Sequence, residues 1–169
     1  MNFHGIEKDS MLNGDGLRVV LWVSGCNHHC KGCQNPQTWD VNSGREFTFD
    51  DLLELMAEVN KRHVAGLTIS GGDPLHPDNW ETVHKICEDI KNQFPRKTIW
   101  VYTGYKWEDV VCDLCFPDFS KYVDVIVDGE FIEELKDVNY HWAGSTNQRV
   151  IDVKKSLEQG EVVLWRSND

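Results

Sequence analysis

The sequence has no apolar run that approaches the roughly 20 residues needed to span a bilayer. Residues 1–16 are polar, so the apolar segment of a secretory signal peptide is also missing. These two absences lead us to expect a cytoplasmic protein that has no membrane partner.

Basic residues are scarce as well. The chain has 17 Lys and Arg against 28 Asp and Glu, which gives a formal net charge of −11. The longest basic runs are Lys61 with Arg62 and Lys154 with Lys155. A phosphate backbone repels such a chain unless basic residues are concentrated in a patch, so we expect no nucleic-acid partner.

Internal repeats, low-complexity tracts and linkers rich in Pro, Gly or Ser are absent too. The 169 residues are 40% hydrophobic and 27% charged, a composition typical of one packed domain. We therefore expect a single domain over residues 1–169. Its core is expected at about 15–150, with a short C-terminal extension at 151–169.

Short apolar, β-branched runs alternate with longer amphipathic windows along the chain. The runs predict strands at 19–24, 66–70, 98–102 and 122–127, with two further short strands at 150–153 and 161–165. The windows predict helices at 49–62, 79–93 and 106–115. Alternating strands and helices favour parallel βαβ units.

About four such units fit in this length, whereas a complete eight-unit barrel needs roughly 250 residues. The sequence therefore predicts an α/β fold that is an open, partial (β/α) barrel. It would contain about four to five βα units and a mainly parallel, curved sheet.

Two of the helices carry capping signals. Thr48 with Asp51 predicts a capping box at the start of 49–62, and Asp78 with Glu81 predicts a cap for 79–93. The inward stripe of the first helix is expected to comprise Leu52, Leu53, Met56 and Val59.

Ligands of parallel sheets bind at the carboxyl ends of the strands. This rule points to the four loops 25–36, 71–78, 103–106 and 128–130 as the candidate site.

The first of these loops carries Cys26, Cys30 and Cys33 in a CxxxCxxC spacing. In a cytoplasmic chain, clustered cysteines bind metal or react more often than they form disulfides. Three thiolates can hold three irons of a cubane cluster and leave the fourth iron open. Two alternatives remain from the spacing: a zinc site closed by His28 or His29, and three buried thiols without a ligand.

The other cysteines give weaker signals. Cys112 and Cys115 form a second CxxC on the predicted helix 106–115. We interpret them as inert helix cysteines, with a second metal site as the alternative. Cys87 lies in the apolar stripe of its helix and is predicted to be core.

Six ordered segments extend the pattern beyond the cysteines. They are NGDGLR (13–18), VSGCNHHCKGCQN (23–35), SGGDPLHPDN (70–79), WVYTGYK (100–106), VDVIVDGEF (123–131) and GSTNQR (144–149). Together they resemble the radical S-adenosylmethionine (SAM) superfamily, and within it the activating proteins of the anaerobic, glycyl-radical ribonucleotide reductases. The resemblance runs from about residue 1 to 150.

The resemblance implies a [4Fe–4S] cluster on Cys26, Cys30 and Cys33, whose open iron chelates the amino and carboxylate groups of SAM. The residues it assigns to SAM binding are Gly32, Cys33, Gln34, Gly71, Gly72, Asp73, Thr103 and Asp128. Gly32 replaces an aromatic residue of many members, and Gln34 replaces a tyrosine of close relatives. Adenine stacking is therefore expected from Trp39 or Tyr102.

The implied reaction is reductive cleavage of SAM, followed by formation of a glycyl radical on a partner protein. That partner would be the large subunit of an anaerobic ribonucleoside-triphosphate reductase, and the electron would come from a flavodoxin-like donor. The candidate docking loop contains Gly144, Ser145, Asn147, Gln148 and Arg149, with a plain surface turn as the alternative. Two other functions stay open: activation of a different glycyl-radical enzyme, and a zinc-binding interaction module.

Overall fold

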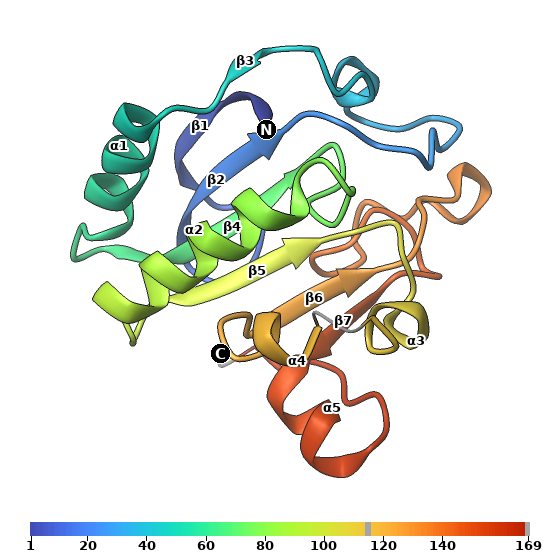
Figure 1. The fold of residues 1–169 in the computed structure, drawn as a ribbon. Coiled ribbons are helices and arrows are strands. Elements are labelled where there is room, and N and C mark those ends of the chain that lie inside the picture. Colours follow the sequence, from blue (N-terminus) through green and yellow to red (C-terminus); the bar gives the residue numbers. More distant parts are fainter. Residues whose placement is uncertain (114–115, 168–169) are drawn as a thin grey trace.

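The computed structural model describes residues 1–113 and 116–167, and within them seven strands form one sheet (Figure 1). The strands are β1 (Asn2–Ser10), β2 (Leu17–Val23), β3 (Arg45–Glu46), β4 (Val64–Gly71), β5 (Thr98–Tyr102), β6 (Val125–Asp128) and β7 (Arg149–Asp152). Their order across the sheet is β3-β1-β2-β4-β5-β6-β7.

The four central strands β2, β4, β5 and β6 are parallel, as the alternation of strands and helices predicted. The flanking strands β1, β3 and β7 pair antiparallel with their neighbours. The sheet is therefore mixed and not closed, and the partial barrel stays a prediction. Strand β1 was missed because its residues form no apolar run.

Helices cover one face of this sheet (Figure 1). They are α1 (Phe49–Val59), α2 (Trp80–Gln93), α3 (Trp107–Val110) and α4 (Phe116–Phe119), with α5 (Val153–Gln159) after β7. Two short 3₁₀ turns, η1 (Pro36–Thr38) and η2 (Glu133–Leu135), lie in the connections after β2 and β6. Among the described residues, none of these helices has the length and apolar character that crossing a membrane requires. The helix predicted over 106–115 is shorter, because α3 ends at Val110. Cys112 is exposed after it, and Cys115 lies outside the described residues.

Helix α1 begins with the predicted capping box. The Thr48 backbone N–H donates to Asp51 Oδ2 at 2.8 Å, and the Asp51 N–H donates to the Thr48 hydroxyl at 3.4 Å. The predicted inward position of Leu53 is wrong, since this side chain is 49% exposed. Leu55 is buried instead, because the inner face follows the i, i+4 spacing that Asp51, Leu55 and Val59 share.

The opposite face of the sheet carries a second apolar cluster. Trp100, Val125 and Val127 form its buried centre, and Tyr102, Trp142, Ala143, Val150 and Trp165 pack against them. Residues 151–167 therefore contribute to the sheet and to this cluster. The strand expected at 161–165 is reduced to one bridge between Ile151 and Leu164.

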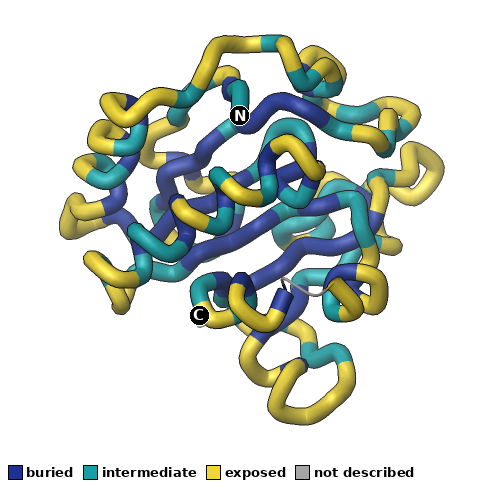
Figure 2. The backbone as a smooth tube through the Cα atoms, viewed as in Figure 1, coloured by how far each residue is buried: buried dark blue, intermediate teal, exposed yellow. Residues whose placement is uncertain are grey.

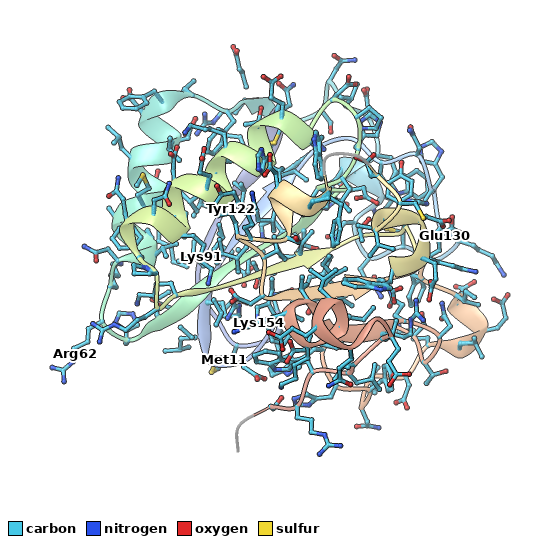
Figure 3. All side chains as sticks on the ribbon, turned by 60° about the horizontal axis from the view of Figure 1, so that its bottom comes forward. Met11, Arg62, Lys91, Tyr122, Glu130 and Lys154 are labelled. Atoms are coloured by element: carbon cyan, nitrogen blue, oxygen red, sulfur yellow. The ribbon has the colours of Figure 1, made fainter. Side chains whose placement is uncertain are left out.

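The fold gathers loops at one edge. The central strands are buried and the outer helix faces are exposed, whereas the loops after the strands mix buried, intermediate and exposed residues (Figure 2). Arg62, just before β4, and Glu130, just after β6, lie at opposite ends of the molecule (Figure 3). The carboxyl ends of the parallel strands consequently share the edge where Glu130 lies.

Candidate functional site

A cavity of about 740 Å³ lies at this edge. Its lining includes residues from all four predicted loops: Cys26, Cys30, Cys33, Gln34, residues 70–73, residues 103–104 and residues 129–131. The structure thus brings together the three cysteines, the Gly-Gly turn and Thr103. Gly32 and Asp128, two of the residues expected to contact SAM, do not line this cavity.

The cysteine loop starts with a sharp turn at Gly25, whose φ of 97° favours glycine. The Gly25 and Cys26 N–H groups donate to the carbonyls of Thr38 and Trp39, at 2.7 and 3.0 Å. These bonds close the loop on itself through the turn η1, so the cysteines are held against the end of β2.

The Gly-Gly turn after β4 packs directly on this loop. The Asp73 N–H donates to the Gly25 carbonyl at 2.7 Å, and a Cβ on Gly72 would lie only 2.5 Å from that oxygen. Only glycine fits at position 72 without moving the backbone. The turn thereby sets the place of the cysteine loop as well as lining the cavity.

The three cysteines of the loop are half-buried. Burial raises the pKa of Cys26 and of Cys30; the N–H groups of His28 and His29 oppose the rise at Cys26, and that of Phe131 opposes it at Cys30. The Asn35 N–H donates to Cys33 Sγ at 3.3 Å. Such bonds stabilise thiolates and occur around the sulfurs of iron–sulfur clusters, so this donor set fits three ligands of a cluster.

His28 is engaged elsewhere. Its Nε2 lies 2.9 Å from Asp73 Oδ2, and its Nδ1 lies 2.9 Å from Glu130 Oε1. The hydrogen bond with Asp73, and then that with Glu130, raise the His28 pKa against the effect of burial. With both ring nitrogens held by carboxylates, His28 is not disposed as a metal ligand. Within residues 1–113 and 116–167, no three His, Cys, Asp or Glu side chains converge as a site for a single metal ion.

Asp73 is buried and organises three of the four loops. Its carboxylate accepts from the Thr103 hydroxyl at 2.9 Å, the Gly104 N–H at 2.9 Å and the Leu75 N–H at 2.8 Å, besides its contact with His28. Asp73 and Thr103 therefore fasten the cavity wall to the ends of β4 and β5.

Asn79 is a site residue that sequence reasoning missed. It is fully buried, and its side-chain amide donates to the carbonyls of Ser24 at 2.7 Å and Asp73 at 2.9 Å. The predicted cap at Asp78 is wrong, because Asn79 is the N-cap residue of α2 and its side chain makes these loop contacts instead. The sequence signal for Asn79 was its place at the end of the segment SGGDPLHPDN, which also contains the Gly-Gly turn.

Asp128 faces a second cavity of about 750 Å³, away from the cysteines. Its carboxylate accepts from the Trp107 N–H at 2.8 Å and from the Arg149 guanidinium at 3.1 Å. Asp128, and then Glu108, raise the pKa of Arg149. These contacts tie β6 to α3 and β7 and leave the SAM contact expected of Asp128 without support.

The predicted docking loop is used largely inside the chain. Gln148 accepts from the Gly144 and Ser145 N–H groups at 2.9 and 3.1 Å, and donates to the Gly129 carbonyl at 2.9 Å. Asn147 donates to the Glu130 carbonyl at 2.8 Å. The loop braces residues 129–130 of the cavity wall, so the expected role of these polar groups in docking has no support here.

Aromatic and apolar side chains complete the cavity. Trp39 and Tyr102, the two candidates for adenine stacking, both line it. Met11, Leu12 and Val138 also line it and are 70%, 83% and 85% exposed, which gives the mouth an apolar character.

Comparison with known proteins places these features in a family. The model for the 4Fe-4S single cluster domain matches residues 12–151. An anaerobic ribonucleoside-triphosphate reductase-activating protein of Enterobacteria phage T4 is 43% identical over 150 residues, covering 89% of this chain and 93% of the relative.

Proteins of the same name are 40% identical in Escherichia coli strain K12, over 89% of this chain and 97% of the relative, and 39% identical in Vibrio cholerae, over 88% and 96%. The chain therefore belongs to the family of anaerobic ribonucleoside-triphosphate reductase-activating proteins.

Proposed function

We propose that this chain is a radical SAM enzyme that generates a glycyl radical on an anaerobic ribonucleoside-triphosphate reductase. Cys26, Cys30 and Cys33 would hold a [4Fe–4S] cluster whose fourth iron binds SAM. The observation that carries the proposal is the convergence of these cysteines with the Gly-Gly turn on one cavity.

A cluster held by Cys26, Cys30 and Cys33 would supply the one-electron reduction that cleaves SAM, with methionine as the leaving group, and the chemistry would end with removal of a hydrogen atom from a glycine Cα of the partner. The chain's own residues bind and orient. A cavity of about 740 Å³ falls in the range of small-molecule sites, about 300–1,000 Å³. Gly71 and Gly72 place main chain on the cavity wall, and Asp73 with Thr103 keeps that wall rigid.

The proposed partner is the large subunit of the reductase, following the names of the relatives. The exposed apolar side chains Met11, Leu12 and Val138 at the mouth suit a polypeptide that enters the cavity. The electron would come from a flavodoxin-like donor. Lys31, beside the cysteines, is paired with Glu133 and Glu134 at 3.0 and 3.3 Å, so it offers such a donor little free positive charge.

The zinc-binding module is the less favoured function. Carboxylates already hold both nitrogens of His28, and the ring of His29, the other candidate ligand, stacks on Trp39 with ring centroids 4.7 Å apart. Activation of another glycyl-radical enzyme is less favoured because the reported relatives are named for the reductase.

Anaerobic reconstitution with iron and sulfide tests the proposal. We expect about four irons per chain and reductant-dependent formation of 5′-deoxyadenosine from SAM. Cys26→Ser, Cys30→Ser and Cys33→Ser should each abolish this activity. Cys112→Ser, which changes an exposed cysteine outside the cavity, should retain it. A chain that holds one zinc and cleaves no SAM would overturn the proposal.

A further inference from the structure

Asp15 joins two distant parts of the chain. It lies between β1 and β2, and its Oδ1 accepts from Trp142 Nε1 and from the Ser167 hydroxyl, both at 2.7 Å. Its Oδ2 accepts from Trp165 Nε1 at 2.8 Å. Hydrogen bonds to a carboxylate are stronger than those between neutral groups, and an indole N–H can only donate. The Asp15 carboxylate thus accepts hydrogen bonds from the indole N–H groups of two tryptophans.

One of these tryptophans is part of the cysteine cavity. Trp142 lines the cavity, and its φ of 62° lies in the left-handed region that bulky residues rarely adopt. Such a conformation persists only where the surroundings fix it. Three contacts do so here: the Trp142 carbonyl accepts from the Tyr102 hydroxyl at 2.8 Å, and the indole N–H donates to Asp15 at 2.7 Å and to the Ser167 hydroxyl at 3.4 Å.

The other tryptophan lies outside the cavity lining. Trp165 packs edge-on against the buried Trp100, with ring centroids 5.8 Å apart, and its backbone N–H donates to the Val150 carbonyl at 2.8 Å. Trp142 packs against the same Trp100 ring at 6.2 Å. Segment 164–167 is therefore anchored to the sheet and reaches the cavity wall through Asp15.

We propose that Asp15 is a positioning residue, which fixes the Trp142 indole in the wall of the cysteine cavity while Trp165 and Ser167 hold the carboxylate in place. The fixed wall would favour SAM binding, a consequence that rests on the proposed function. A carboxylate is required, because the amide of an asparagine at position 15 would turn an N–H₂ group toward one of the indole N–H donors.

Hydrogen exchange and SAM binding test this role in the full chain. Asp15→Asn and Trp165→Phe should each speed amide exchange in residues 136–144 of the protein without added cofactors. In the reconstituted protein, each should raise the Kd for SAM about three- to tenfold at an unchanged iron content. Because Trp165 would act through Asp15, the double variant should match Asp15→Asn alone.

The matched controls, Asp9→Asn and Trp80→Phe, change residues outside this cavity and should alter neither the exchange of residues 136–144 nor the Kd for SAM.

Variants that lower the Tm but leave both the exchange of 136–144 and the Kd unchanged would overturn the inference, since Asp15 would then be only structural. If the unsubstituted chain binds no SAM, the proposed function fails. In that case the exchange measurement alone tests the role of Asp15. Faster exchange of residues 136–144 in the variants supports the proposal that Asp15 fixes Trp142, and unchanged exchange overturns it.

Discussion

At the scale of the residue, Gly72 shows how the fold fixes the cysteine loop. A Cβ at this position would lie 2.5 Å from the Gly25 carbonyl oxygen and 2.9 Å from the Gly25 nitrogen. Both atoms belong to the backbone, which cannot move aside as a flexible side chain would. The turn after β4 and the start of the cysteine loop are therefore shaped by one contact.

Gly72→Ala should displace the cysteine loop. We expect the iron content after reconstitution to fall to less than about half, and the free energy of unfolding to fall by about 1–3 kcal/mol, as for other overpacked sites. Iron analysis and urea unfolding measure the two effects.

Gly160→Ala is the matched control for that variant. Gly160 ends α5 with a φ of 72°, and nothing lies within 4 Å of its added Cβ. This change should lower stability by about 1 kcal/mol and leave the iron content unchanged. Full iron loading of Gly72→Ala would show that the contact with Gly25 does not position the loop.

The residues that sequence reasoning identified are those with local signals. Three cysteines within eight positions and a Gly-Gly pair can be recognised in a short stretch. The pairing of His28 with Glu130 spans 102 positions, and that of Asp15 with Trp165 spans 150. Such contacts depend on which strands become neighbours, which no local pattern encodes.

At the scale of the element, the capping box of α1 predicts a pH dependence of stability. The ion pair with Arg45, followed by the hydrogen bonds from Thr48, holds the pKa of Asp51 well below its usual range against the effect of burial. A carboxyl whose pKa is lower in the folded state stabilises the fold at neutral pH. That contribution is lost as the pH falls below the unfolded value of about 3.9 toward the folded pKa.

Asp51→Asn should therefore lower the free energy of unfolding at pH 7 by about 1 kcal/mol, the usual size of a lost cap. The difference from the unsubstituted chain should shrink as the pH falls from 5 to 3, as followed by urea unfolding. Asp50→Asn changes the exposed neighbour in the same first turn and serves as the control. If the difference in free energy of unfolding between the two chains stays constant from pH 5 to pH 3, ionisation of the Asp51 carboxylate is not its cause.

Elements were predictable where their apolar pattern was long. The four parallel strands and the helices α1 and α2 follow from such patterns. Helix α5 was missed although its caps are present: the Asp152 side chain accepts from the Lys155 N–H at 3.0 Å, and Gly160 adopts the left-handed conformation after its last residue. Helix α5 has only seven residues, so its helical periodicity is too short to be distinguished from the apolar pattern of the strand before it.

At the scale of the whole molecule, the core lies on both faces of the sheet and the cysteines lie at its edge. Folding should therefore not depend on the cluster, unlike in zinc fingers, which are unfolded without their metal. We expect the chelated, iron-free chain to keep its far-UV circular dichroism and a cooperative urea transition. An iron-free chain with the spectrum of an unfolded protein would contradict this arrangement.

The central claim is that the three-cysteine cavity generates a radical on a glycine of a partner reductase. Electron paramagnetic resonance of that reductase, after incubation with the reconstituted chain, SAM and a reductant, tests it most directly. We predict a stable organic radical whose hydrogen splitting collapses when the reductase glycines are deuterated at Cα, and which is absent when Cys30→Ser replaces the intact chain. A fully iron-loaded chain that yields no such radical, or a signal that persists with Cys30→Ser, would contradict the account.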